Sequence, residues 1–293
     1  MDVPVRGEAD MTGVGRSAVE PGAAKERNGM NNFFLLKQMV LRNIQSRFRG
    51  NILGWLWSFL LPLLMLTVYT VVFGGFFKSR WGNNDENRMV FATALFSGIT
   101  LYNIFGESVS VATSCVTGNV SYVKKVRFNL EILPLSQTLS TFILSLSWVF
   151  LLLVCTGLVF KQACWSWLLL PVTLLPLVLF AAGVAFFTSS LGVYFRDLQY
   201  LIGVLLQMLF FLSPVFYRLG DEMRAQYWKY LRFNPLVWFI ETNRKVLFHG
   251  LLPEYSALPS QTDYLMCYML GIAAFLAGWL WFRETKRGFS DVL

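Results

Sequence analysis

The chain has 293 residues, of which 55% are hydrophobic and only 14% are charged, and it carries a formal net charge of +8. This apolar excess excludes a single water-soluble domain, because leucine and phenylalanine would have to cover its surface. A lipid bilayer is the alternative solvent, and it demands uncharged helices of about 20 residues to cross a hydrocarbon layer about 30 Å thick.

The region before the first apolar stretch divides into two parts. Residues 1–30 are polar and mixed in charge, show no signal-peptide pattern, and are expected to form a disordered cytosolic tail. Residues 31–51 predict a basic amphipathic helix at the membrane interface, with Arg42, Arg47 and Arg49. Such a helix can anchor on anionic lipid or dock a cytosolic partner, and the sequence leaves both open.

Six apolar stretches are long enough to cross a membrane, and the only charged residue within them is Glu107. They cover residues 52–77, 89–113, 132–160, 164–193, 198–217 and 264–282. The sequence therefore predicts an all-α integral membrane protein with six transmembrane helices over residues 52–283. Residues 284–293 are expected to form a cytosolic tail, because Lys and Arg are in excess on the side that holds both termini.

Glu107 is an intramembrane acid near the cytosolic end of the second stretch. An ionisable side chain at this depth is costly, so it is expected to face protein or water and to have a partner. A structural ion pair and a role on a transport path both fit this position.

Two short loops carry charge on the predicted cytosolic side. The first, GNVSYVKKVRFNLEILPLS, holds Lys124, Lys125 and Arg127, and the second is a tight turn with Arg196 beside Asp197. Such charges commonly do no more than fix the topology of the chain. The alternative is that both loops contact the same cytosolic partner.

The long loop 218–263 is rich in aromatic residues, which a solvated linker would not be. A short helix is predicted after Asn234-Pro235. We expect this loop to dip into the outer leaflet of the membrane, sheltered by protein, because unpaired backbone groups are not tolerated against lipid.

Several kinds of chemistry are missing from the sequence. It contains no P-loop, no dinucleotide fingerprint, no G-x-S-x-G and no HExxH, so no catalytic residue and no ATP hydrolysis by this chain are expected. The four cysteines form no CxxC pair, which favours buried thiols over a metal site. A carrier coupled to an ion gradient needs several buried charges, and only one is present, which favours a separate motor.

Taken in order, these segments resemble the membrane subunit of ABC-2 type polysaccharide exporters, the permeases for O-antigen, capsule and teichoic acid. The resemblance covers about residues 33–287, and one departure is Asn129, where the family often has proline. The matching pieces are Arg47-Phe48-Arg49, Leu53-Gly54-x-Leu56-Trp57 with Pro62, Glu107, residues 118–128, Glu131–Leu135, Tyr194–Asp197, and Asn234-Pro235-Leu236 with Glu241.

The resemblance implies a type V exporter architecture, with two copies of this chain and two ATPase subunits that bind ATP and Mg. No cofactor is expected in the chain itself, and no nucleic acid among its partners. A coupling segment would contact the ATPase, and re-entrant gate helices would lie on the outer side with Asn234, Pro235 and Glu241. The residues implied in ATPase coupling are Asn119, Tyr122, Lys124, Lys125, Arg127, Phe128, Arg196 and Asp197.

The implied substrate is a lipid-linked polysaccharide carried across the bacterial cytoplasmic membrane, with membrane lipid as a further partner. Sugars present C–H faces to aromatic rings, so aromatic residues of the spans are candidates for lining a channel, although they can equally face lipid. The candidates are Trp57, Tyr69, Phe73, Tyr102, Phe210, Phe211 and Tyr217. The alternatives are an ABC-2 exporter of a drug or lipid, and an ion-coupled carrier or membrane-embedded enzyme.

Overall fold

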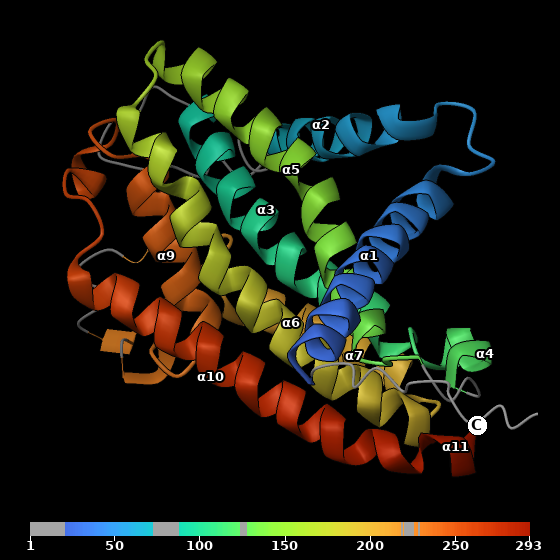
Figure 1. Cartoon of the computed structure of the whole chain (residues 1–293). Coiled ribbons are helices and arrows are strands. Elements are labelled where there is room, and N and C mark those ends of the chain that lie inside the picture. Colours follow the sequence, from blue (N-terminus) through green and yellow to red (C-terminus); the bar gives the residue numbers. More distant parts are fainter. Residues whose placement is uncertain (1–20, 73–87, 124–127, 218, 220–225, 228) are drawn as a thin grey trace, which may run out of the picture.

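A computed structural model of the chain describes residues 21–72, 88–123, 128–217, 219, 226–227 and 229–293. These residues form helices and connecting turns, and no strand occurs among them (Figure 1). The predicted all-α class is therefore confirmed for this part of the chain. The basic residues at 124–127 and the aromatic residue Phe73 lie outside it.

The first helix, α1 (Pro21–Phe48), is longer toward its start than the sequence suggested. The sequence predicts a disordered tail over residues 21–30, but these residues are helical, because a helix extends cooperatively from a segment that is already packed. Its later half packs on α5 (Ile132–Phe160), where Met39, Val40 and Asn43 are buried. The helix crosses the bundle at a steep angle (Figure 1).

After α1 the chain turns through two glycines into a short 3-10 turn, η1 (Gly54–Leu56), and then α2 (Trp57–Tyr69). Gly50 and Gly54 have φ values of 87° and 51°, a backbone region that costs a side chain energy, which explains glycine at both turns. Only 6% of the apolar stretch Gly54–Val72 is buried. α2 therefore presents most of its apolar surface to the outside of this chain.

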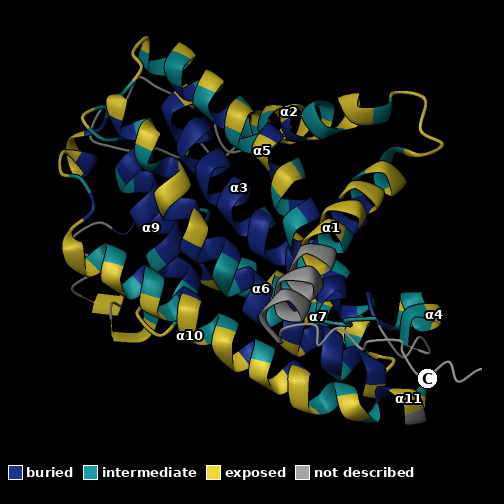
Figure 2. Cartoon of the chain, in the orientation of Figure 1, coloured by how far each residue is buried: buried dark blue, intermediate teal, exposed yellow. Residues whose placement is uncertain are grey.

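The body of the fold is a bundle of α3 (Arg88–Thr113), α5, α6 (Leu170–Tyr194) and α10 (Gln261–Thr285). The central helix is α3, whose apolar stretch is 89% buried (Figure 2). Among the described residues, five segments are long and apolar enough to cross a membrane: Gly54–Val72, Met89–Thr113, Ile132–Phe160, Trp165–Tyr194 and Gln261–Gly288. The predicted span 198–217 is the exception.

That segment forms α7 (Leu198–Leu212), which is shorter than the stretch 198–217 drawn from the sequence. The helix stops because Pro214 disfavours a helical conformation at Ser213, whose φ and ψ are −92° and 151°. Fifteen helical residues reach only about 22 Å. A sixth complete crossing therefore stays a prediction.

Two helices of the bundle touch through their backbones. A Cβ atom at Gly278 of α10 would lie 2.0 Å from the carbonyl oxygen of Gly183 in α6, and one at Gly271 would lie 2.6 Å from that of Pro176. No side chain fits at such distances, so α6 and α10 owe their close approach to these glycines, as helices in membranes commonly do.

Short elements close the two ends of the bundle. At one end lie η3 (Thr117–Asn119), α4 (Val120–Val123), η6 (Lys286–Gly288) and α11 (Phe289–Val292), with α4 and α11 near each other in Figure 1. At the other end η4 (Trp165–Leu169) packs against α9 (Pro235–Leu247), and Tyr255 of η5 (Pro253–Tyr255) lies 5.9 Å from the ring of Phe248, the residue after α9.

Candidate functional site

The predicted coupling segment is fastened to α1. Arg42 donates hydrogen bonds from Nη1 to the Tyr122 hydroxyl at 2.8 Å and from Nη2 to Asn119 Oδ1 at 3.3 Å. Its guanidinium also lies 5.5 Å from the centre of the Tyr122 ring, which in turn packs 4.7 Å from the ring of Phe128. Arg42 therefore links the interface helix to the loop that follows α3.

The far end of the same segment is fastened to α10. Lys286 Nζ lies 2.7 Å from Glu131 Oε1, and the Trp279 indole donates to Glu131 Oε2 at 3.0 Å. Burial opposes ionisation of this carboxyl group, but the bonds from Lys286 and Trp279 and the charges of Lys286 and Arg283 outweigh it, so the pKa of Glu131 is lowered. The ion pair fixes the start of α5 against the end of α10.

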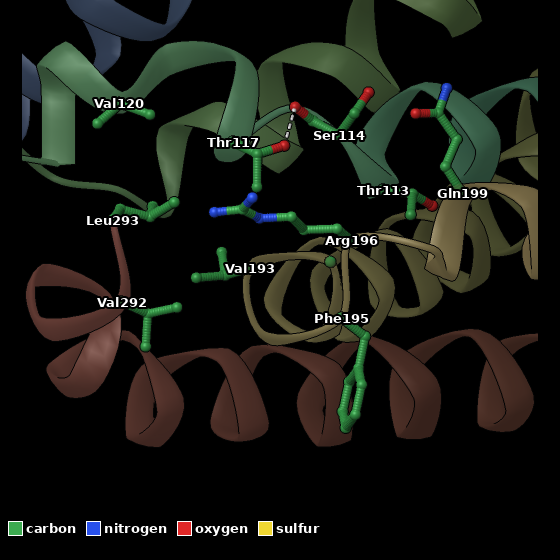
Figure 3. Close-up of a pocket in the computed structure, with 11 residues that line it drawn as sticks. Thr113, Ser114, Thr117, Val120, Val193, Phe195, Arg196, Gln199, Val292 and Leu293 are labelled. Atoms are coloured by element: carbon green, nitrogen blue, oxygen red, sulfur yellow. Dashed lines mark hydrogen bonds between the residues drawn. The ribbon is translucent and has the colours of Figure 1, made fainter.

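The second predicted contact lies beside the first. Arg196 and Asp197 are both exposed, and Arg196 lines a pocket of about 420 Å³ together with Thr117 and Val120 from the coupling segment (Figure 3). The complete lining is Thr113, Ser114, Thr117, Val120, Gly192, Val193, Phe195, Arg196, Gln199, Val292 and Leu293. The fold thus brings the two charged loops to one face, together with residues 292–293, which the sequence did not implicate.

Glu107 has the partner that its position demanded. Its carboxylate forms an ion pair with Arg47 of α1, and Arg47 Nη2 also donates to Thr141 Oγ1 of α5 at 3.3 Å. Arg47 and Glu107 line a cavity of about 680 Å³, and Trp57 is also part of its lining. Arg47 therefore bonds inward to the bundle, whereas Arg49 is exposed.

The candidate channel aromatics that the structure describes fall into separate groups. Tyr102 and Phe210 pack edge to face at 4.9 Å, Phe211 lies 5.6 Å from Phe210, and Tyr102 donates its hydroxyl to the Leu206 carbonyl. Trp57 belongs instead to the cavity at Arg47. Two further candidates are half-buried elsewhere: Tyr69 in α2 and Tyr217 beyond α7.

The predicted gate residues anchor a buried helix. The Asn234 side chain accepts a hydrogen bond from the Leu236 amide at 3.0 Å and so caps α9, with Pro235 at its first turn. The same side chain donates to Ser213 Oγ at 3.0 Å. Glu241 is 7% exposed and lies 3.2 Å from Arg244 Nη1.

Comparison with known proteins gives this arrangement a family. Residues 35–248, from α1 to the residue after α9, match the family described as ABC-2 type transporter. The chain belongs to the ABC-2 type transporter family. The resemblance drawn from the sequence is confirmed, and the chain is a multi-pass membrane protein.

Relatives within this ABC-2 family cover most of the chain. The O-antigen export system permease protein RfbA of Myxococcus xanthus is 30% identical over 231 residues, which cover 76% of this chain and 84% of that protein. A protein of the same description from Klebsiella pneumoniae is 25% identical over 265 residues, covering 89% and 95%. The polysialic acid transport protein KpsM of Escherichia coli is 25% identical over 242 residues, covering 80% and 88%.

Sequence reasoning did not single out Arg244 of this ABC-2 subunit, which lies in the aromatic-rich stretch 218–263. Its side chain is fully buried and donates to the backbone carbonyls of Val215 at 3.0 Å and Ala94 at 3.3 Å. It also donates to Ser97 Oγ at 3.3 Å. The only signal in the sequence was the acid three positions earlier, Glu241, which is a common spacing on exposed helices too.

Proposed function

We propose that this chain is the transmembrane subunit of an ABC exporter that carries a lipid-linked polysaccharide, of O-antigen type, across the bacterial cytoplasmic membrane. A separate ATPase subunit binds ATP and Mg and supplies the energy. Two copies of the chain and two ATPase subunits form the transporter, and both termini face the cytosol.

The observation that carries the ATPase coupling is the fastening of the loop after α3 at both ends. Arg42 binds it to α1, and Glu131 binds it to the end of α10 through Lys286. A loop held at both ends passes a displacement caused by the ATPase to two helices at once, whereas a loop without these contacts would move without displacing either helix. Arg47 extends the path from α1 to Glu107 in α3.

Support for the polysaccharide cargo comes from the relatives, whose names include O-antigen export permeases and a polysialic acid transport protein. Exposed aromatic side chains fit a polymer that must slide. Trp57 is 36% exposed and Phe211 is 60% exposed on helices whose apolar faces this chain does not cover. In a dimer these faces can meet a second copy or the sugar chain.

The test combines copurification with export. The full chain is expected to copurify with a cytosolic ATPase, and reversal of Lys124, Lys125 and Arg127 to glutamate is expected to lower polysaccharide export at least about tenfold while ATP hydrolysis persists. The matched control is reversal of Arg287, an exposed cation 3.3 Å from Glu284. Export that survives reversal of the basic group would contradict the assignment of the coupling segment.

The cargo is tested separately in a deletion strain. Loss of surface polysaccharide, restored by the wild-type gene, is the expected result. Normal surface polysaccharide would instead support an ABC-2 exporter of a drug or lipid, and transport by the purified chain without ATP would support an ion-coupled carrier.

A further inference from the structure

Residues 284–293 contact both charged loops of the proposed docking face. Tyr194, two residues before Arg196, donates its hydroxyl to the Thr285 carbonyl at 3.0 Å. Lys286 reaches the other loop through its ion pair with Glu131. The segment that the sequence presented as a tail therefore joins two loops that are far apart along the chain.

The same segment is packed tightly enough to hold a defined position. Phe289 is fully buried, with its ring 5.6 Å from that of Phe282 and 6.0 Å from that of Tyr194. A Cβ atom at Gly288 would lie 2.9 Å from the Tyr194 hydroxyl oxygen, so the backbone itself lies against α6. Because Phe289 is fixed, the residues that follow it are placed on the pocket wall.

The pocket combines one cation, Arg196, with walls that are partly polar and partly apolar. Figure 3 shows the Arg196 side chain extended between Val193 and Thr117, with Leu293 and Val120 on the opposite side of its guanidinium group. In the part of the chain that the structure describes, no carboxylate lies within ion-pair distance of Arg196. The guanidinium group is thus available to a partner from outside the chain.

We propose that residues 289–293 complete a docking pocket for an acidic side chain of the ATPase subunit, with Arg196 as its cationic partner and Val292 and Leu293 as one wall. This inference rests on the proposed function and adds a named contact and a third segment to it. A carboxylate suits the site because it pairs with the planar guanidinium in two parallel hydrogen bonds. The side chains of Val120, Val193 and Val292 limit the access of water to this side of the pocket, which strengthens the attraction between the guanidinium group and a carboxylate.

The experiment measures binding of the copurifying ATPase, separately purified, to the full chain in lipid nanodiscs at 0.15 M salt. Arg196→Glu is expected to raise the dissociation constant about tenfold or more, since it replaces attraction by repulsion at a partly enclosed charge. Leu293→Asp places a negative charge on the proposed wall and is expected to act in the same direction. Both effects should shrink at 0.5 M salt.

The matched control is Arg287→Glu, which makes the same change of charge on a neighbouring side chain that is 74% exposed and does not line the pocket. It is expected to change the dissociation constant less than about twofold. A melting temperature within about 2 °C of wild type verifies that each variant is folded, because surface changes usually cost little stability.

Two outcomes would overturn the inference. Equal weakening by Arg196→Glu and Arg287→Glu would mean that only the overall charge matters. Unchanged binding by Leu293→Asp would remove residues 289–293 from the docking pocket. A different result would refute the proposed function, namely wild-type chain that binds no ATPase. Loss of ATPase binding on reversal of Lys124 and Lys125, with binding by the pocket variants unchanged, would refute the pocket alone.

Discussion

Replacement of Arg244 by alanine should destabilise this protein more than any exposed charge change. The side chain is fully buried in α9 and bonds to α3 through Ala94, to the turn after α7 through Val215, and to Glu241 on its own helix. Alanine removes all of these bonds together and leaves Glu241 buried without this cation.

The loss of stability expected for Arg244→Ala follows from the burial of the Arg244–Glu241 ion pair. Breaking a buried ion pair by removing one partner costs about 3–5 kcal/mol, because the remaining charge stays out of water. An unfolding entropy of about 2.1 cal/mol/K per residue gives about 0.6 kcal/mol/K for a chain of 293 residues. The melting temperature of Arg244→Ala should therefore fall by about 5–8 °C.

The assay is thermal unfolding of the detergent-purified chain, followed by the loss of the monodisperse peak in size-exclusion chromatography. The matched control is Arg232→Ala, an exposed arginine whose guanidinium lies 5.3 Å from the Phe233 ring. It should shift the melting temperature by less than about 2 °C, because exposed contacts of this kind contribute about 1 kcal/mol or less.

A second variant tests the same contact without deleting the charge. A Cβ atom at Gly98 would lie 2.7 Å from Arg244 Nη2 and 3.0 Å from Val215 Cα, so Gly98→Ala should cost about 1–3 kcal/mol through overpacking. A melting temperature for Arg244→Ala equal to that of Arg232→Ala would refute the reasoning, and a neutral Gly98→Ala would show that the contact is looser than described.

Three further predictions concern the other contacts. Arg47→Glu and Glu107→Arg should each lower the stability of the fold by about 1 kcal/mol, since the ion pair is partly exposed. The double variant, in which the two charges are exchanged, should regain most of the export seen in cells. Export by the double variant no better than that of either single variant would count against the pair. Folding lowers the pKa of Glu131, so its carboxylate stabilises the fold at pH values above its unfolded pKa of about 4.3. That stabilisation is lost as the pH falls through the lower pKa of the folded state. Glu131→Gln should therefore flatten the acid side of a plot of melting temperature against pH. Gly278→Ala should destabilise by about 1–3 kcal/mol, whereas Gly203→Ala, with nothing within 4 Å of its Cβ, should not.

The sequence anticipated those features that depend on neighbours along the chain. Long apolar stretches located the helices α3, α5, α6 and α10 to within a few residues. The pair Asn234-Pro235 marked the start of α9, because a capping amide and a proline at the first turn act within one turn of helix. The early stop of α7 was also readable from Pro214, but hydropathy alone carried the predicted span past it.

The interior partners of charged residues could not be predicted in this way. Glu107 clearly needed a partner, yet nothing in its own helix pointed to Arg47, which lies 60 positions away. Arg244 looked like one of several cations in an aromatic loop, and its burial depends on backbone carbonyls from α3 and from the turn after α7. Such a site exists only where distant segments meet.

The basic loop after α3 shows most clearly which features the sequence determines and which features only the tertiary structure decides. By itself, the sequence determined the membrane class, the position of that loop and the family, because transfer of an apolar stretch into lipid is decided by the stretch alone. Only the tertiary structure decided that Arg42 and Lys286 hold the loop's two ends and that residues 292–293 lie beside Arg196. Ion pairs and pockets require side chains within about 4 Å of one another, and that depends on how the helices pack rather than on where they begin and end.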